Sequence, residues 1–477
     1  LACTLDRPRR RAAYTTVFGR RMTLDPDAPD ISLPEPATRV RYRVLAMLCL
    51  LSFILYLDRI CIGQAVSAIK HDLAISNFAM GFVLGAFTVA YGLFEIPTGH
   101  WGDRYGSRGV LARIVVWWSI FTVLTGAATG LVMLIIVRFL FGAGEAGAFP
   151  NVARVLARWF PADTRGTAQG IVITAAAVGG AAAPMVTQQL LDQLDWRWTF
   201  AVLGIPGLIW AAAFYAWFHD DPATHPSTNA VERQYIAGGT APPTDGAEHP
   251  SVPWRRVLTS RNIWLLGGVV TCGAFTTYMF FSWYPTYLKD GRDVTPNLAG
   301  YLASAVLAGG AAGSLLGGPI TDQLVRRLGS RRWCRSAVGC GFMTTAAGSM
   351  VASIFADSPW VATAWMMWAC FAIHFQLISW WGAVTEISGR HLGALFGLMN
   401  SLGVPGAVAS QLFLGWFVDC LGGLGYTGRD QWDPAFYVYG SLLMIGAACW
   451  LFIDVTKSAV APEAESSSAS SASLRAT

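Results

Sequence analysis

Two charged side chains lie within one of the most apolar stretches of the sequence. Arg138 and Glu145 are seven residues apart, and apolar or small residues surround them. On a helix this spacing places both on one face, about 10 Å from each other. Ionisable groups at membrane depth are costly and usually face a partner or a water-filled cavity, so the pair is a candidate for binding an anion or carrying a proton. We expect Arg138 to hold the Glu145 carboxylate when no substrate is bound. The structural alternative is an ion pair that only locks helices together.

A second charged pair, Asp58 and Arg59, interrupts an apolar run at 44–64. Neighbouring residues on a helix point about 100° apart, so the two charges cannot share one task on one face. Arginine stays protonated and its planar group fits a carboxylate, so Arg59 is the first candidate anchor for an anionic substrate and Arg138 the second. Asp58 and Glu145 can exchange protons if burial raises their pKa values. The alternative is that Asp58 and Arg59 only neutralise each other.

The composition indicates which elements position these charges. Only 13% of the 477 residues are charged and 54% are hydrophobic, which excludes a soluble globular protein and indicates many membrane spans. The net charge of +5 comes from short loops, so no nucleic-acid partner is expected. Gly142, Gly144 and Gly147 fit a dinucleotide fingerprint but lack its strand and soluble surroundings. The nine cysteines form no metal or disulfide pattern, and we expect no cofactor, no metal and no enzymatic activity.

The apolar runs predict an all-α membrane protein with twelve transmembrane helices in two six-helix halves. The expected helices are 44–64, 79–99, 109–129, 131–153, 166–190, 198–218, 262–287, 298–319, 335–355, 360–382, 391–417 and 435–455. The corresponding regions are a disordered tail at 1–43, an N-terminal half at 44–218, a linker at 219–261, a C-terminal half at 262–455 and a disordered tail at 456–477. The sequence begins at Leu1, and Met22 is an alternative start.

Arginines predict the orientation of the helices. They gather after the second, fourth, eighth and tenth helices, at Arg104, Arg108, Arg113, Arg154, Arg158, Arg165, Arg326, Arg327, Arg331, Arg332, Arg335 and Arg390. The positive-inside rule then places both termini and the linker in the cytoplasm, with the chain spanning the inner (plasma) membrane.

A motif repeats in the two halves. Gly99, Asp103, Arg104, Gly106 and Arg108 follow the second helix, and a related segment with Asp322 follows the eighth. Repeated six-helix halves are typical of alternating-access carriers with a substrate site at the midplane. The first motif matches the signature G-x-x-x-D-R-x-G-x-R in full, so the chain resembles a major facilitator superfamily transporter over about residues 40 to 455.

Three further motifs resemble the anion:cation symporter family within this superfamily. They are Tyr56-Leu-Asp58-Arg59, the charges at Arg138 and Glu145, and the segment Trp283-Tyr-Pro-Thr-Tyr-Leu288. Members take up sugar acids such as hexonates and glucarate, or aromatic acids such as phthalate. The resemblance implies proton coupling through the residues matching Asp58 and Glu145.

The resemblance also implies further site residues. Tyr56, Tyr91, Trp380 and Asn400 fall where sugar-acid relatives hold the substrate or line the cavity. The motif from Gly99 to Arg108, with its echo at Asp322, would gate the carrier. In the short loop that we predict there, a carboxylate such as Asp103 could cap a helix of the other half.

Several alternatives stay open at this level. Sodium could replace the proton as the driving ion. Thr174-Ala-Ala-Ala177 stands where sugar-acid members often have a polar side chain, which leaves room for an aromatic acid. A drug exporter is the rival within transport, although it would be expected to lack an anchor such as Arg59. The expected partners are a small organic anion, protons and the lipid bilayer, and we expect a monomer.

Overall fold

The structure is a computed structural model, and it describes residues 36–238, 252–388, 391–456 and 460. In this part of the chain twelve helices are long and apolar enough to cross a membrane, as the hydropathy pattern predicts. The predicted tails at 1–43 and 456–477 lie mostly outside the described residues.

The helices of the N-terminal half are α1 (Val40–Leu73), α2 (Asn77–Tyr105), α3 (Ser107–Gly126), α4 (Leu131–Glu145), α5 (Ala148–Trp159), α6 (Ala162–Leu191) and α7 (Trp196–Trp217). The linker contains α8 (Ala230–Ala237) and α9 (Trp254–Thr259). The helices of the C-terminal half are α10 (Arg261–Ser282), α11 (Tyr284–Thr286), η1 (Tyr287–Gly291), α12 (Pro296–Leu328), α13 (Arg331–Ile354), α14 (Pro359–Ser388), α15 (Leu392–Gly423), α16 (Arg429–Trp432) and α17 (Ala435–Phe452).

The first helix begins at Val40, four residues before the predicted position 44. The cause is the linker helix α8, whose Glu232 carboxylate accepts hydrogen bonds from the backbone N–H groups of Val40 and Arg41, both at 3.1 Å. A carboxylate in this position satisfies free N–H groups and favours the positive end of the helix dipole. The linker is therefore partly helical and holds the start of α1.

Helix packing repeats between the two halves. In the first half α1 packs on α6, α2 on α4 and α3 on α7. In the second half the corresponding pairs are α10 with α15, α12 with α14 and α13 with α17. Two matching pairs, α2 with α15 and α6 with α12, join the halves. This pairing is the internal two-fold repetition that the duplicated loop motif predicts.

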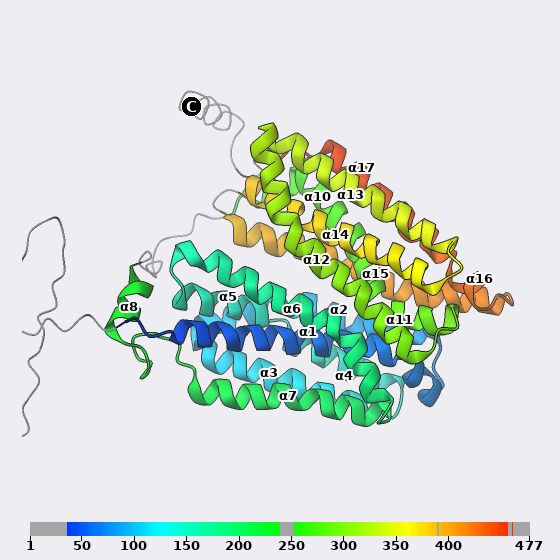
Figure 1. The fold of residues 1–477 in the computed structure, drawn as a ribbon, viewed down its shortest axis with the longest axis horizontal. Coiled ribbons are helices and arrows are strands. Elements are labelled where there is room, and N and C mark those ends of the chain that lie inside the picture. The colour runs from blue at the N-terminus through cyan, green and yellow to red at the C-terminus, as the bar shows by residue number, and fades with distance from the viewer. Residues whose placement is uncertain (1–35, 239–251, 389–390, 457–459, 461–477) are drawn as a thin grey trace, which may run out of the picture.

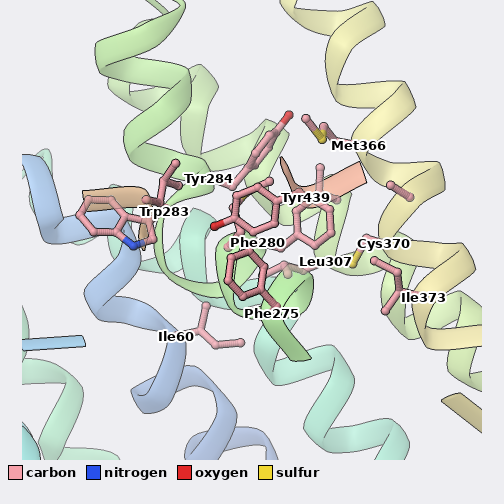
Figure 2. Close-up of a cluster of buried hydrophobic side chains, with 14 of the residues drawn as sticks. Ile60, Phe275, Phe280, Trp283, Tyr284, Leu307, Met366, Cys370, Ile373 and Tyr439 are labelled. Carbon is pink, nitrogen blue, oxygen red and sulfur yellow. The ribbon is translucent and has the colours of Figure 1, made fainter. Parts of the chain in front are cut away.

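Buried apolar side chains form one core within the N-terminal half and a second core that extends across both halves. Figure 2 shows part of the second core, which includes Ile60 of α1 together with Phe275 and Phe280 of α10. Because the core passes from α1 into the C-terminal half, the halves are packed together rather than only tethered by the linker.

The two halves meet mainly at one end of the bundle. We call it the far end, and the opposite end, which holds the start of α1 and the linker helix α8, the linker end. In Figure 1 the halves converge toward α11 and α16 and diverge toward α8. At the far end Lys70 forms an ion pair with Asp290 at 3.2 Å, and Lys289 donates to the Gln64 carbonyl at 2.7 Å. Burial lowers the pKa of Lys289 to about 8.

Asp419 of α15 closes the same end by capping α2 of the other half. Its carboxylate accepts hydrogen bonds from the backbone N–H of Phe78 at 2.8 Å and from the Asn77 side-chain amide at 2.7 Å. The backbone N–H of Asn77 adds a third, at 3.3 Å. We expected Asp103 at the linker end to cap a helix of the other half. The structure shows such a cap from Asp419 at the far end. The Asp103 side chain lies outside the described part.

Replacing Asp419 with alanine is expected to shift the protein toward a state open at the far end. The variant loses charge-assisted bonds worth about 1–3 kcal/mol in the closed state, a population change of roughly five- to 150-fold. Spin labels on the α1–α2 and α15–α16 loops, in a cysteine-depleted background, would report a longer separation. Asp357→Ala is the control, because Asp357 is exposed and pairs with Arg429 inside the C-terminal half. An unchanged label separation would contradict the role of Asp419.

Candidate functional site

An ion pair between α1 and α4 forms the centre of the candidate site. The Nε atom of Arg59 donates to Glu145 Oε1 at 2.7 Å, and Nη2 of Arg59 contacts the same oxygen. The side chains are 10% and 1% exposed. The second carboxylate oxygen, Oε2, has no hydrogen-bond partner among the described residues. Arg59 thus uses only one oxygen of Glu145 and is not held in the bidentate geometry that a carboxylate can offer.

Aromatic rings surround the Arg59 guanidinium. Its central carbon lies 4.9 Å from the centroid of Tyr56, 5.3 Å from that of Phe87 and 4.6 Å from that of Tyr91. These distances are in the range of cation–π attraction, which strengthens when water is excluded. Helix α4 can approach α2 this closely because Gly142 faces the Phe87 carbonyl, where a Cβ atom would collide.

Arg138 lies deeper than Arg59. It is 2% exposed, and its guanidinium carbon is 4.4 Å from the Phe141 centroid and 5.4 Å from that of Phe87. Its Nε atom has no hydrogen-bond partner among the described residues. We expected Arg138 to hold Glu145 along α4, and the structure corrects this, because Glu145 pairs with Arg59 of the neighbouring helix. Two helical turns are too far for a direct ion pair.

Asp58 completes a buried group of four charges. It is fully buried, and its Oδ2 accepts a hydrogen bond from the Trp118 indole at 3.2 Å. Its Oδ1 has no hydrogen-bond partner among the described residues. The Asp58 carboxylate lies close enough to Glu145 to be repelled by it and close enough to Arg138 to be attracted by it. Asp58, Arg59, Arg138 and Glu145 together sum to zero charge, which is the arrangement that keeps ionised groups tolerable inside a membrane protein.

The other predicted substrate residues differ in how accessible their side chains are. Tyr56 and Tyr91 lie against Arg59, as described above. Asn400 of α15 is exposed. Trp380, in contrast, is 1% exposed, and its indole donates to the Leu266 carbonyl at 2.9 Å. The prediction that Trp380 lines the cavity is therefore corrected for this conformation, since its hydrogen bond and burial are those of a packing residue between α14 and α10.

The gating motif is only partly described. For residues 99–105, which include Gly99, Asp103 and Arg104, the structure describes only the helical backbone. Gly106 has a φ of 78°, which glycine adopts without strain, and it joins α2 to α3. Arg108 donates to the Tyr215 carbonyl from Nε at 2.8 Å and from Nη2 at 2.6 Å. It therefore stabilises the end of α7 within its own half, whereas Asp322 is exposed on α12.

Sequence reasoning missed two polar residues near Arg59. Glu95 follows Tyr91 by one turn on α2, and its carboxylate interacts with the Asn400 side chain. Tyr278 of α10 brings a hydroxyl from the C-terminal half and interacts with Arg59 and with Thr88 of α2. The i, i+4 spacing of Tyr91 and Glu95 was the available signal for the first. No local signal identifies the second, because it depends on how the halves meet.

Two six-helix halves with a buried charged site between helices are typical of secondary carriers. Residues 48–411 match the family model described as Major Facilitator Superfamily. The chain belongs to this superfamily, and it is a multi-pass membrane transporter rather than an enzyme.

Two relatives are named for small organic anions. One, named "Probable sulfoacetate transporter", is from Cupriavidus necator and is 31% identical over 420 residues, which cover 87% of this chain and 94% of the relative. The other, named "Probable galactarate/D-glucarate transporter", is from Bacillus subtilis and is 31% identical over 402 residues, covering 81% and 87%. The resemblance to organic-anion transporters that the sequence motifs indicate is therefore confirmed.

A solved structure shares the fold. It is a bacterial homologue of the human lysosomal transporter Spinster, described as inward-facing and unoccupied. It matches with a TM-score of 0.73 at 19% identity and covers 88% of this chain and 98% of that one. The predicted all-α fold with twelve transmembrane helices in two halves is confirmed.

Proposed function

We propose that this transporter is a symporter that imports a small organic carboxylate together with a proton, with a sugar acid as the substrate class. The Arg59–Glu145 ion pair inside a neutral group of four buried charges carries the proposal. An incoming anion would leave that group with an excess negative charge in a low-dielectric environment. A proton taken up by Glu145 or Asp58 restores neutrality, so anion and proton favour each other's binding.

The geometry also supports a competition between substrate and Glu145. In this structure Arg59 is occupied by Glu145. Protonation of Glu145 weakens its hold on Arg59, and the guanidinium then offers two parallel N–H groups to a substrate carboxylate. Arg138 remains in the same buried group as the second cation. Asp58 is the second candidate carrier of the proton.

The substrate class rests on the lining of the site and on the relatives. The rings of Tyr56 and Tyr91 lie against Arg59, and Asn400 is exposed on α15 of the other half. Hydroxyl and amide groups suit a hydroxylated acid. Relatives named for sulfoacetate and for galactarate and D-glucarate support a small polar anion.

We further propose that the linker end faces the cytoplasm, with both termini, and that the membrane is the inner membrane. The arginine-rich loops support this orientation. With the far end closed by Asp419, Lys70 and Lys289, the structure then corresponds to an inward-facing state. Alternating access would break the far-end contacts and bring the halves together at the linker end.

The test is uptake into proteoliposomes. A counterflow screen of sugar acids, aromatic acids and short dicarboxylates identifies a substrate, and its uptake is then measured with and without an acidic exterior. We expect an inward proton gradient to stimulate uptake without sodium. Uptake that requires sodium and does not respond to the pH gradient would contradict proton coupling, and counterflow of aromatic acids alone would contradict the sugar-acid class.

A further inference from the structure

Glu95 lies on α2 where the Arg59 group and the other half of the protein come together. Phe87, Tyr91 and Glu95 follow each other at four-residue intervals, so they share one helical face. The rings of the first two lie against the Arg59 guanidinium. Glu95 continues this face beyond the two aromatic residues, and its side chain is partly exposed.

The same residue also borders α15. Gly92, one turn before Glu95, packs against Val404, and Val404 lies one turn after Asn400. The side-chain amide of Asn400 lies near enough to the Glu95 carboxylate to interact with it. Along the α2–α15 contact the pairs run from Asn77 with Asp419, through Thr88 with Gln411, to Glu95 with Asn400. The last pair thus lies on the linker-end side, where this structure diverges.

A carboxylate at this place has consequences for the charge of a substrate. The four buried charges sum to zero, and an ionised Glu95 adds one negative charge beside them. A substrate that fixes one carboxylate at Arg59 and extends toward α15 brings its other end to Glu95 and Asn400. Hydroxyl groups there can donate to the Glu95 carboxylate, whereas a second carboxylate would be repelled by it.

We infer that Glu95, held by Asn400, selects the charge of the substrate, favouring hydroxylated monocarboxylates over dicarboxylates of the same length. This inference rests on the proposed function. Such selection through a repulsive group is a general route to specificity, because it discriminates against one ligand without binding the other more tightly. The two relatives described above are named for dianions, and similarity to them does not decide this point, since a single side chain does.

The experiment compares two acids that differ in one end only. D-Galactonate carries one carboxylate, and galactarate has a second carboxylate in place of the terminal hydroxymethyl group. Their counterflow is measured in proteoliposomes with the full chain and with Glu95→Gln. We expect the full chain to prefer galactonate, and Glu95→Gln to raise the galactarate-to-galactonate ratio by about tenfold or more. A monodisperse size-exclusion profile of Glu95→Gln shows separately that the variant is folded.

Two further variants sharpen the result. Glu95→Asp keeps the charge and should keep the preference for galactonate. Asp357→Asn changes the net charge equally at a fully exposed site and should leave the ratio unchanged. An unchanged ratio in Glu95→Gln, with both acids exchanged by the full chain, overturns the inference alone. Failure of the full chain to exchange either acid overturns the sugar-acid class and the inference with it.

Discussion

Replacing Glu145 with glutamine is expected to abolish concentrative uptake and to leave substrate exchange intact. Glutamine keeps the shape of the side chain and the acceptor oxygen that Arg59 contacts, but it neither takes up nor releases a proton near neutral pH. Exchange needs no net proton movement, so counterflow should continue. Uptake against a concentration gradient requires the proton step and should fall to the level of equilibration.

The pH dependence of substrate affinity provides a second readout. In the unmodified chain a proton on Glu145 releases Arg59, so affinity should rise as the pH falls through the pKa of this carboxyl. In Glu145→Gln that competition is gone, and affinity should be high and nearly independent of pH. Binding titrations at several pH values on the purified variant measure this difference.

A matched control is available in the C-terminal half. Glu386 pairs with Arg335 at 2.9 Å and is partly buried, so Glu386→Gln makes the same chemical change in an ion pair away from Arg59. It should retain both counterflow and proton-driven uptake. Loss of both activities in Glu145→Gln, or retention of both, would falsify the coupling role and leave Glu145 as a structural partner of Arg59.

Replacing Arg59 with alanine is expected to weaken substrate binding by about 100-fold or more, the usual cost of leaving a buried charge without its partner. Lysine should restore little of this affinity, because a point charge cannot reproduce two parallel N–H donors or stack between rings. Thermal-shift or calorimetric titrations with the substrate identified by counterflow would measure both variants. Wild-type affinity in Arg59→Lys would contradict the assignment of Arg59 as the anchor.

Loss of Arg59 also leaves Glu145 buried without its partner, which can harm folding. The double variant Arg59→Ala/Glu145→Ala removes both charges and separates the two effects. Normal expression and a monodisperse size-exclusion profile without substrate binding would support the anchor. Restored binding in the double variant would show instead that Arg59 serves only to neutralise Glu145. Arg113→Ala, at an exposed arginine of α3, is the control for loss of positive charge.

The sequence by itself determined the elements and the class of protein. Apolar runs of about twenty residues predict helices in a membrane, because a helix satisfies its backbone hydrogen bonds within one segment and the strands of a closed barrel are only about ten residues long. Charges are costly in such runs, which is why Asp58, Arg59, Arg138 and Glu145 could be identified as site candidates without a structure. The duplicated loop motif similarly indicated two equivalent halves, and the packing of α1 on α6 and α10 on α15 agrees with it.

Only the tertiary structure decided which of these residues meet. Spacing along α4 suggested Arg138 as the partner of Glu145, whereas the structure supplies Arg59, which reaches Glu145 from α1. The sequence could not show whether Trp380 packs between helices or lines the cavity, because its burial depends on the contact with Leu266 of another helix. Helix formation and membrane insertion follow from local composition, whereas rotation and lateral contacts follow from side-chain packing between segments distant in sequence. The cap that Asp419 gives to α2, and the meeting of Glu95 with Asn400, exist only because the two halves close on each other in this arrangement.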